Sequence, residues 1–175
     1  LRGVDLFLSH WGSPWIAHTI VSFDFEGQPP LAVSIETRKE EGESYSAVLG
    51  FFRQYELYYV VADERDVIGV RTNHRGEDTY LYRVRMPLSR VREILLDYAA
   101  DMNRLADEPR WYNAATTNCT TVIRQRVQHV AGPNPWDWRI LVNGKVDELM
   151  YERGTIAHSA PFPEIRAASA ISARA

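Results

Sequence analysis

The only cysteine of this 175-residue chain lies in the segment Tyr112–Thr121, directly before a predicted helix. Apolar residues recur at helical spacing after it, at Val122, Ile123, Val127 and Val130. Thr117 or Asn118 is suited to cap that helix, because either side chain accepts a hydrogen bond from a free first-turn amide. The free amides and the helix dipole favour a thiolate and can hold an oxyanion. Cys119 is therefore the candidate nucleophile, and the alternative is a buried cysteine that packs as a small apolar residue.

A thiol nucleophile needs an imidazole close by, so the five histidines are compared as partners. His129 lies further along the same helix, roughly 15 Å of axial rise away, and does not reach Cys119. His74 is expected in a solvated charged turn and His158 in a solvated late loop, while His10 is expected in a loop that could bring it to the site. His18 is the preferred general base, because it stands on a predicted strand whose hairpin partner carries polar residues on the matching face. A hydrogen-bonded core histidine is an equal alternative for His18.

A third group is expected to orient the imidazole through its second ring nitrogen, as catalytic triads require. Glu36 is the first choice and Ser34 is the second. The alternative for Glu36 is a surface ion pair with Arg38 on the same strand face. The candidates for oxyanion binding and substrate positioning near the cysteine are Asn118, Asn113 and Tyr112. Both asparagines are equally suited to turn hydrogen bonds around the cysteine.

Alternating apolar residues predict a hairpin of two strands over Trp15–Phe25 and Leu31–Arg38. Further strands are predicted over Leu57–Ala62, Val67–Thr72 and Thr79–Arg85, with a charged turn over residues 63–66 and an apolar lead-in and turn over residues 1–14. Helices are predicted from Ser89 to about Ala106, from Cys119 onward and over Val146–Arg153, with a fraying tail from Ala167.

These elements predict one α+β domain over residues 1–175, an antiparallel sheet with packed helices and the nucleophile at a helix N-terminus. Its core is expected over about residues 15–131, followed by a helical and loop extension over about 132–175. A hydrophobic content of 45% and a charged content of 25% are ordinary globular values.

The charge and the cysteine count exclude several classes of protein. A net charge of -3 and a pI near 6.0 argue against nucleic acid as the partner. One cysteine excludes an intramolecular disulfide and a multi-cysteine metal site. No metal or cofactor is expected, because the histidines and carboxylates do not fall at ligand spacing. No apolar run reaches transmembrane length and Leu1 begins in mid-pattern, so any signal or membrane anchor is expected upstream.

Four segments together resemble the DUF4105 family, also called the Lnb N-terminal periplasmic domain family. They are Ala17–Phe23, Ser34–Arg38, Phe51–Asp66 and Tyr112–Thr121, and the resemblance covers nearly the whole chain in order. That family is similar to the NlpC/P60 papain-like superfamily in its circularly permuted form, where the histidine strand precedes the cysteine helix. The resemblance implies a papain-like fold in which Cys119 matches the nucleophile and His18 the general base.

The resemblance also implies an activity, that of a bacterial envelope lipoprotein N-acyltransferase in the periplasm, tethered to the inner membrane. Such an enzyme takes an acyl chain from a phospholipid and passes it through a cysteine thioester to a lipoprotein amine. The alternative is a papain-like amidase or peptidase that acts on cell-wall (peptidoglycan) or peptide bonds, and the second alternative is a non-catalytic binding module. Acyl transfer needs an apolar groove that keeps water from the thioester, whereas a cell-wall hydrolase needs an open polar cleft.

Four tryptophans bear on the choice of substrate. If the substrate is a lipid, Trp136 and Trp138, with Trp11 and Trp15, are expected to form an apolar rim near the cysteine. The physical reason is that indoles favour the boundary between lipid headgroups and chains. The alternative is that these tryptophans fill the core beneath a long loop, since tryptophan is highly buried on average.

Overall fold

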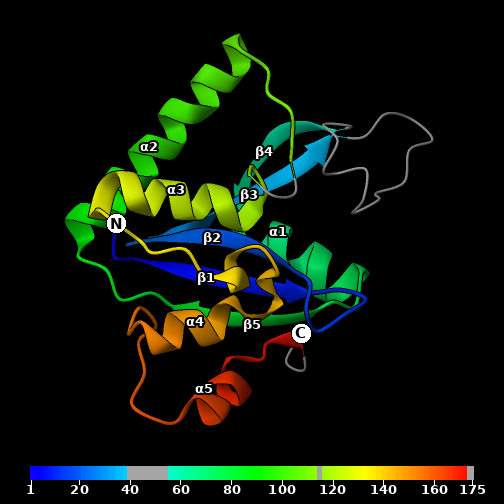
Figure 1. The fold of residues 1–175 in the computed structure, drawn as a ribbon, viewed down its shortest axis with the longest axis vertical. Helices are drawn as coiled ribbons and strands as arrows, with labels where there is room; N and C mark the ends of the chain where they lie inside the picture. The colour runs from blue at the N-terminus through cyan, green and yellow to red at the C-terminus, as the bar shows by residue number, and fades with distance from the viewer. Residues whose placement is uncertain (39–54, 114–115, 173–175) are drawn as a thin grey trace.

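The computed structural model describes residues 1–38, 55–113 and 116–172. Within these residues, five antiparallel strands form one sheet in the order β4-β3-β2-β1-β5 (Figure 1). The strands are β1 Gly3–His10, β2 Ala17–Phe25, β3 Gln28–Arg38, β4 Glu56–Asp63 and β5 Asp78–Arg83. β1, β2 and β3 are the inner strands, so the residues on them are the most enclosed in the sheet.

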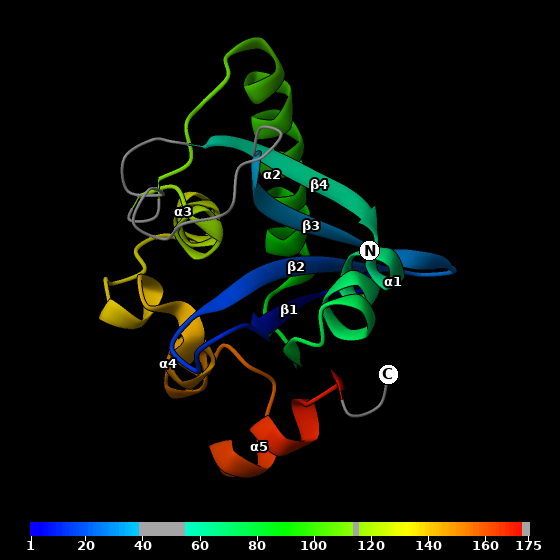
Figure 2. The same cartoon turned by 90° about the vertical axis from the view of Figure 1, so that its right-hand side faces the viewer.

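Helices cover both faces of this sheet (Figures 1 and 2). One face is covered by α2 (Leu88–Asp107), α3 (Cys119–Ala131) and α4 (Val146–Glu152). The other face carries α1 (Glu64–Gly69) and a π-helix that follows it (Val70–His74), while α5 (Phe162–Ser169) packs beside β5. Two short 3-10 turns, Trp138–Ile140 and Asn143–Lys145, lead from α3 to α4. The chain is therefore an α+β fold with five packed α-helices in its described part.

The alternation of side chains along the inner strands divides the core between the two faces. Under α2 and α3 the buried side chains include Val21, Phe23, Val33, Ile35, Tyr98 and Val122. On the opposite face, Phe7, Ile20 and Ala32 pack against Val67 and Ile68 of α1. Each large apolar side chain buried in this way contributes roughly 1.5–3 kcal/mol. This packing fixes α3, and with it Cys119, against β2.

Much of the predicted order of elements is confirmed. β2 and β3 form the predicted hairpin, with Ile20 opposite Ser34 and Val21 opposite Val33. β4 and β5 match the strands predicted near Leu57–Ala62 and Thr79–Arg85. The three predicted helices are present as α2, α3 and α4, although α2 begins at Leu88, before the predicted cap Ser89.

The first strand was missed, and the expectation that His10 lies in a loop is wrong. Residues 3–10 form β1, which pairs with β2 and with β5 and is buried on both faces. Because both faces of this strand are buried, Val4 to Leu8 is apolar apart from Asp5 and shows no regular alternation of apolar and polar residues. His10 ends this strand, is buried, and its Nε2 lies 2.9 Å from the carbonyl oxygen of Gly144.

The strand predicted over Val67–Thr72 is wrong, and so is the charged turn before it. These residues form α1 and the π-helix, because the Asp63 side chain accepts a hydrogen bond from the Arg65 amide and starts a helix there. The β-branched residues of the segment predicted a strand, but their burial against Phe7 and Ile20 stabilises the helix instead.

The C-terminal tail also differs from expectation. Residues 162–169 form α5, and Ala170 bridges Tyr80 of β5. The Ser172 hydroxyl donates to the Glu77 carbonyl and accepts from the Thr79 amide, so the tail is held to β5 as far as residue 172. The polar stretch 39–46 and most of the unassigned stretch 48–55 lie outside the described residues.

Candidate functional site

Cys119 is the first residue of α3, as predicted, and its side chain is buried. Asn118 caps the helix: its side chain accepts from the Thr121 amide at 2.7 Å, and its own amide donates to the Thr121 hydroxyl at 2.8 Å. This reciprocal capping box fixes the first turn and leaves the cysteine at the positive end of the helix dipole. The position favours the thiolate form over the thiol.

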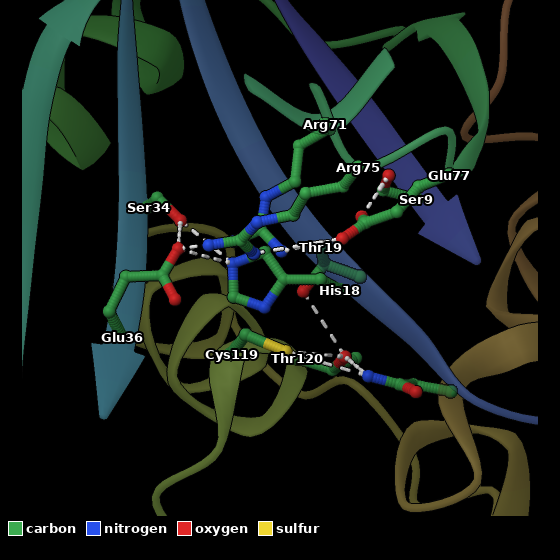
Figure 3. A network of polar contacts seen from close by, with 11 residues as sticks. Ser9, His18, Thr19, Ser34, Glu36, Arg71, Arg75, Glu77, Cys119 and Thr120 are labelled. Atoms are coloured by element: carbon green, nitrogen blue, oxygen red, sulfur yellow. Dashed lines mark hydrogen bonds and ion pairs between the residues drawn. The ribbon is translucent and has the colours of Figure 1, made fainter. Parts of the chain in front are cut away.

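His18 lies where β2 and β3 stop pairing. The last pair of residues in the β2–β3 ladder at this end is Ile20 with Ser34. If the two strands continued in the same register, His18 would lie opposite Glu36. Because the ladder ends there, the imidazole occupies the space between the two strands, beside the start of α3 (Figure 3). The end of a hairpin ladder thus brings the histidine strand to the cysteine helix.

The His18 ring is held from the side away from the cysteine. Its Nε2 lies 2.7 Å from the Ser34 hydroxyl and 3.2 Å from a Glu36 carboxylate oxygen, and Ser34 donates to the same oxygen at 2.7 Å. Since the Ser34 proton is given to Glu36, the Nε2 nitrogen carries a proton and donates. That arrangement leaves Nδ1, the ring nitrogen that faces the Cys119 sulfur (Figure 3).

Glu36 is itself held by Arg71, a residue that sequence reasoning did not single out. Arg71 donates to Glu36 at 2.5 Å and to Glu77 at 3.4 Å, and Glu77 also accepts from the Ser9 hydroxyl at 2.7 Å (Figure 3). Glu36 does not pair with Arg38, which instead lies 3.3 Å from Glu56. Arg71 belongs to the π-helix, a kind of segment that often occurs at functional sites.

Charge and hydrogen bonding shift the pKa values of the pair in opposite directions. Burial alone raises the pKa of Cys119, but the charge and hydrogen bond of His18, with hydrogen bonds from Thr19, outweigh burial and lower it to about 6. Burial alone lowers the pKa of His18, but Cys119 and Glu36 raise it to about 9. Burial also opposes ionisation of Glu36, yet His18, Arg71 and Ser34 hold its pKa well below the usual range. Near pH 7 the site therefore holds a thiolate beside an imidazolium.

The amide of Asn143 is the functional group at the sulfur that sequence reasoning missed. Its Nδ2 lies 3.5 Å from the Cys119 sulfur and 2.9 Å from the Thr120 hydroxyl, and its Oδ1 accepts from the Ala17 amide at 3.0 Å. A fixed amide donor beside a nucleophile can stabilise an oxyanion. The one sequence signal was the dipeptide Asn143-Gly144, which is typical of a turn and carries no chemical meaning by itself.

The sequence candidates for the oxyanion have other hydrogen bonds. The Asn118 oxygen is used by the helix cap, and the Asn113 oxygen accepts from the Thr116 amide at 3.1 Å. Tyr112 is buried in the main core, where its amide donates to the Tyr55 carbonyl. The turn-forming alternative therefore describes both asparagines, while a direct role in chemistry stays a prediction for all three residues.

The other histidines lie in different surroundings from His18. His129 on α3 lies 3.3 Å from Asp97 and is largely exposed, and the His158 ring packs on Tyr151. His10 contacts Gly144 and so helps to place the loop that carries Asn143. The structure brings together four residues that the sequence predicted for the site: Cys119, His18, Ser34 and Glu36. Their catalytic roles stay predictions.

An apolar cavity of about 360 Å³ begins beside this group. Thr19 and Thr120, the neighbours of His18 and Cys119, border it and lie 3.2 Å apart through their hydroxyls. The rest of the lining is mostly apolar and includes Val21, Ile123, Val127, Ile140, Val146 and Met150. The volume is in the range of small-molecule sites, and the lining suits a hydrocarbon group.

Among residues 1–38, 55–113 and 116–172, no group of three or more His, Cys, Asp or Glu side chains is arranged to hold a metal ion. No helix in the same part of the chain is long and apolar enough to cross a membrane.

Comparison with known proteins gives one positive result. The model of the Lnb N-terminal periplasmic domain family matches residues 1–144, a span that contains Cys119, His18, Glu36 and Asn143. The chain therefore belongs to the Lnb N-terminal periplasmic domain family. No curated protein and no solved structure matches it.

The ion pair predicts the pH dependence of thiol reactivity. We expect alkylation of Cys119 by iodoacetamide to rise with pH around 6, where the thiolate forms, and to stay high above that value. Replacing Glu36 by glutamine removes a negative charge that raises the pKa of His18, so the imidazolium of that variant should lose its proton at lower pH, as an NMR titration of the ring would show. The measurement is the alkylation rate from about pH 4 to about pH 10. A wild-type rise near pH 9, as for an ordinary thiol, would contradict the ion pair.

Proposed function

We propose that this chain is a cysteine-dependent acyltransferase of the bacterial envelope, which moves an acyl chain from a phospholipid to a lipoprotein amine. The observation that carries the proposal is the position of the apolar cavity, bordered by Thr19 and Thr120 next to the Cys119–His18 pair. A thioester formed on Cys119 would have its hydrocarbon chain beside apolar walls, which exclude water. A cell-wall hydrolase would need polar side chains in that place.

In the first step, the Cys119 thiolate attacks the ester carbonyl carbon of the phospholipid, and the carbonyl electrons move to oxygen. The tetrahedral intermediate collapses by breaking the bond from carbon to the ester oxygen. The His18 imidazolium gives its proton to that leaving oxygen, which departs as the hydroxyl of a lysophospholipid. The products of this step are the Cys119 thioester and a neutral imidazole.

In the second step, the amine of the lipoprotein attacks the thioester carbonyl. Neutral His18 accepts a proton from the attacking nitrogen, and the bond from carbon to sulfur breaks. The amide product leaves, and the site returns to a thiolate beside an imidazolium. Ser34 and Glu36 act by holding the ring so that Nδ1 faces the sulfur throughout, and the charge of Glu36 stabilises the imidazolium.

The fold and the family support this proposal. The order of a histidine strand before a cysteine helix is that of a circularly permuted NlpC/P60 papain-like domain, and we assign the chain to that architecture as part of the proposal. The family name includes a periplasmic domain. Tethering at the inner membrane, by a segment outside residues 1–175, would bring the site to its lipid substrate.

The test is mass spectrometry of the purified chain after incubation with detergent-dispersed phosphatidylethanolamine. We expect a mass gain of one acyl group on Cys119 that neutral hydroxylamine removes, as it does for thioesters, and no such adduct on Cys119→Ser. A lipoprotein peptide with a free amino terminus should remove the adduct and gain the acyl group. Absence of the adduct together with cleavage of a peptidoglycan fragment would replace this proposal by the hydrolase.

A further inference from the structure

Two loops of the molecule expose large apolar side chains. Trp15 is 50% exposed, Trp136 56% and Trp138 53%, and Ile16 and Leu141 are also exposed. The rings of Trp15 and Trp138 lie 6.2 Å apart, so the two loops meet through their indoles. We call these five residues the indole surface. The alternative that these tryptophans fill the core is wrong.

The two loops are fixed to each other below the indoles. The Gly144 amide donates to the Trp15 carbonyl at 3.0 Å, and the Ala17 amide donates to the Asn143 side chain. A Cβ at Gly144 would lie 2.4 Å from the Pro14 carbonyl oxygen, so the backbones are in direct contact. The indoles are therefore presented on a rigid base, and that base also places Asn143 at Cys119.

The loop that carries Trp136 and Trp138 is also a wall of the apolar cavity. The cavity is lined by residues 131–135 and by Ile140. Trp136 and Trp138, which lie between these lining residues in the chain, are exposed. The backbone of this loop is held by Arg124, which donates to the Asn134 carbonyl, and by Arg153, which donates to the Pro135 carbonyl. One loop thus joins an exposed apolar surface to the apolar interior beside the cysteine.

Two of the charged side chains next to the indole surface, Lys145 and Arg139, are ion-paired, whereas Arg124 lies over the Trp136 ring, 5.6 Å from its centroid, and donates to the Asn134 carbonyl. Lys145 lies over the Trp15 ring and bonds Glu148 at 2.9 Å. Arg139 is paired with Asp137 at 3.0 Å and with Glu152 at 2.7 Å. A surface of indoles whose cations beside Trp15 and Trp138 are neutralised matches the headgroup region of a zwitterionic bilayer, where indoles are favoured and no net charge is required.

We propose that the indole surface docks this domain on a phospholipid bilayer, with Trp136 and Trp138 in the headgroup region. Residues 131–142 then lie between the lipid chains and the cavity. The role of the cavity in receiving a chain rests on the proposed function, but the docking itself does not. Because the charges of Lys145 and Arg139 are paired, binding should need no anionic lipid and should change little with salt.

The experiment measures co-sedimentation of Cys119→Ser protein with phosphatidylcholine and phosphatidylethanolamine vesicles at low and high salt. We expect binding at both salt concentrations, and roughly a tenfold loss for each of Trp136→Ala and Trp138→Ala, because each removes one buried indole from the interface. The matched control is Trp111→Ala, since Trp111 is 51% exposed but bridges Glu56 on the edge strand β4. Circular dichroism melts show that each variant is folded.

The outcomes separate docking from chemistry, since Cys119→Ser has no thiol. Tryptophan-dependent vesicle binding supports docking even if the wild-type chain forms no acyl adduct. No vesicle binding, or equal binding of Trp138→Ala and the parent, overturns docking even if the adduct forms from detergent-dispersed lipid. Binding that appears only with anionic lipid also overturns docking on a zwitterionic bilayer. So does tryptophan-dependent retention on insoluble peptidoglycan without vesicle binding.

Discussion

Replacing Cys119 by serine or His18 by alanine is expected to lower acyl transfer by a factor on the order of 10⁴ or more. Serine keeps the shape and the hydrogen-bonding capacity of the side chain but does not ionise near neutral pH, so the nucleophile is lost. Alanine at His18 removes the charge that lowers the thiol pKa and the proton donor for the leaving group. Both losses act on the reacting atoms.

Stability should change little in the serine variant. The buried hydroxyl would have partners in Asn143 and His18, so no polar group is left unsatisfied. Turnover and melting temperature are measured side by side, with His129→Ala as the histidine control, because His129 lies on the exposed side of α3. A melting temperature lowered by more than about 5 °C in Cys119→Ser, with turnover retained, would assign the thiol to packing.

The sequence predicted the position of the cysteine helix and of the histidine hairpin because both follow from local signals. Asn118 is a strong N-cap directly before the cysteine, and the apolar spacing after Cys119 is helical. Likewise, the alternation of apolar and polar residues in β2 and β3 predicted that His18, Ser34 and Glu36 lie on matching faces of one hairpin. Local sequence patterns were therefore enough to select four residues of the candidate site: Cys119, His18, Ser34 and Glu36.

Contacts over long sequence separations were not predictable in this way. Arg71 reaches Glu36 only because residues 64–74 fold as a helix and π-helix, although their β-branched residues favour a strand. Asn143 reaches Cys119 through a loop whose position depends on the Trp15 carbonyl and the Ala17 amide, more than 120 residues earlier in the chain. β1 was missed because burial on both faces removes the alternation that marks a strand.

The same geometry makes Asn143 the most informative residue outside the Cys119–His18 pair. During attack on an ester, negative charge develops on the carbonyl oxygen close to the sulfur, and the Asn143 amide already lies 3.5 Å from that sulfur. Its oxygen is fixed by the Ala17 amide, so the donor points to the site without reorganisation. We expect Asn143→Asp to lower kcat by roughly 10²–10³-fold with a smaller change in KM.

Aspartate is the sharper substitution because it separates the two roles of the side chain. It keeps an oxygen that accepts from the Ala17 amide, so the loop should hold, but it removes the amide donor and places a negative charge beside the thiolate. The iodoacetamide profile should then shift to higher pH, because a like charge raises the pKa of Cys119. Asn143→Ala removes both roles and should also lower the melting temperature. Full kcat in Asn143→Asp would limit Asn143 to holding the loop.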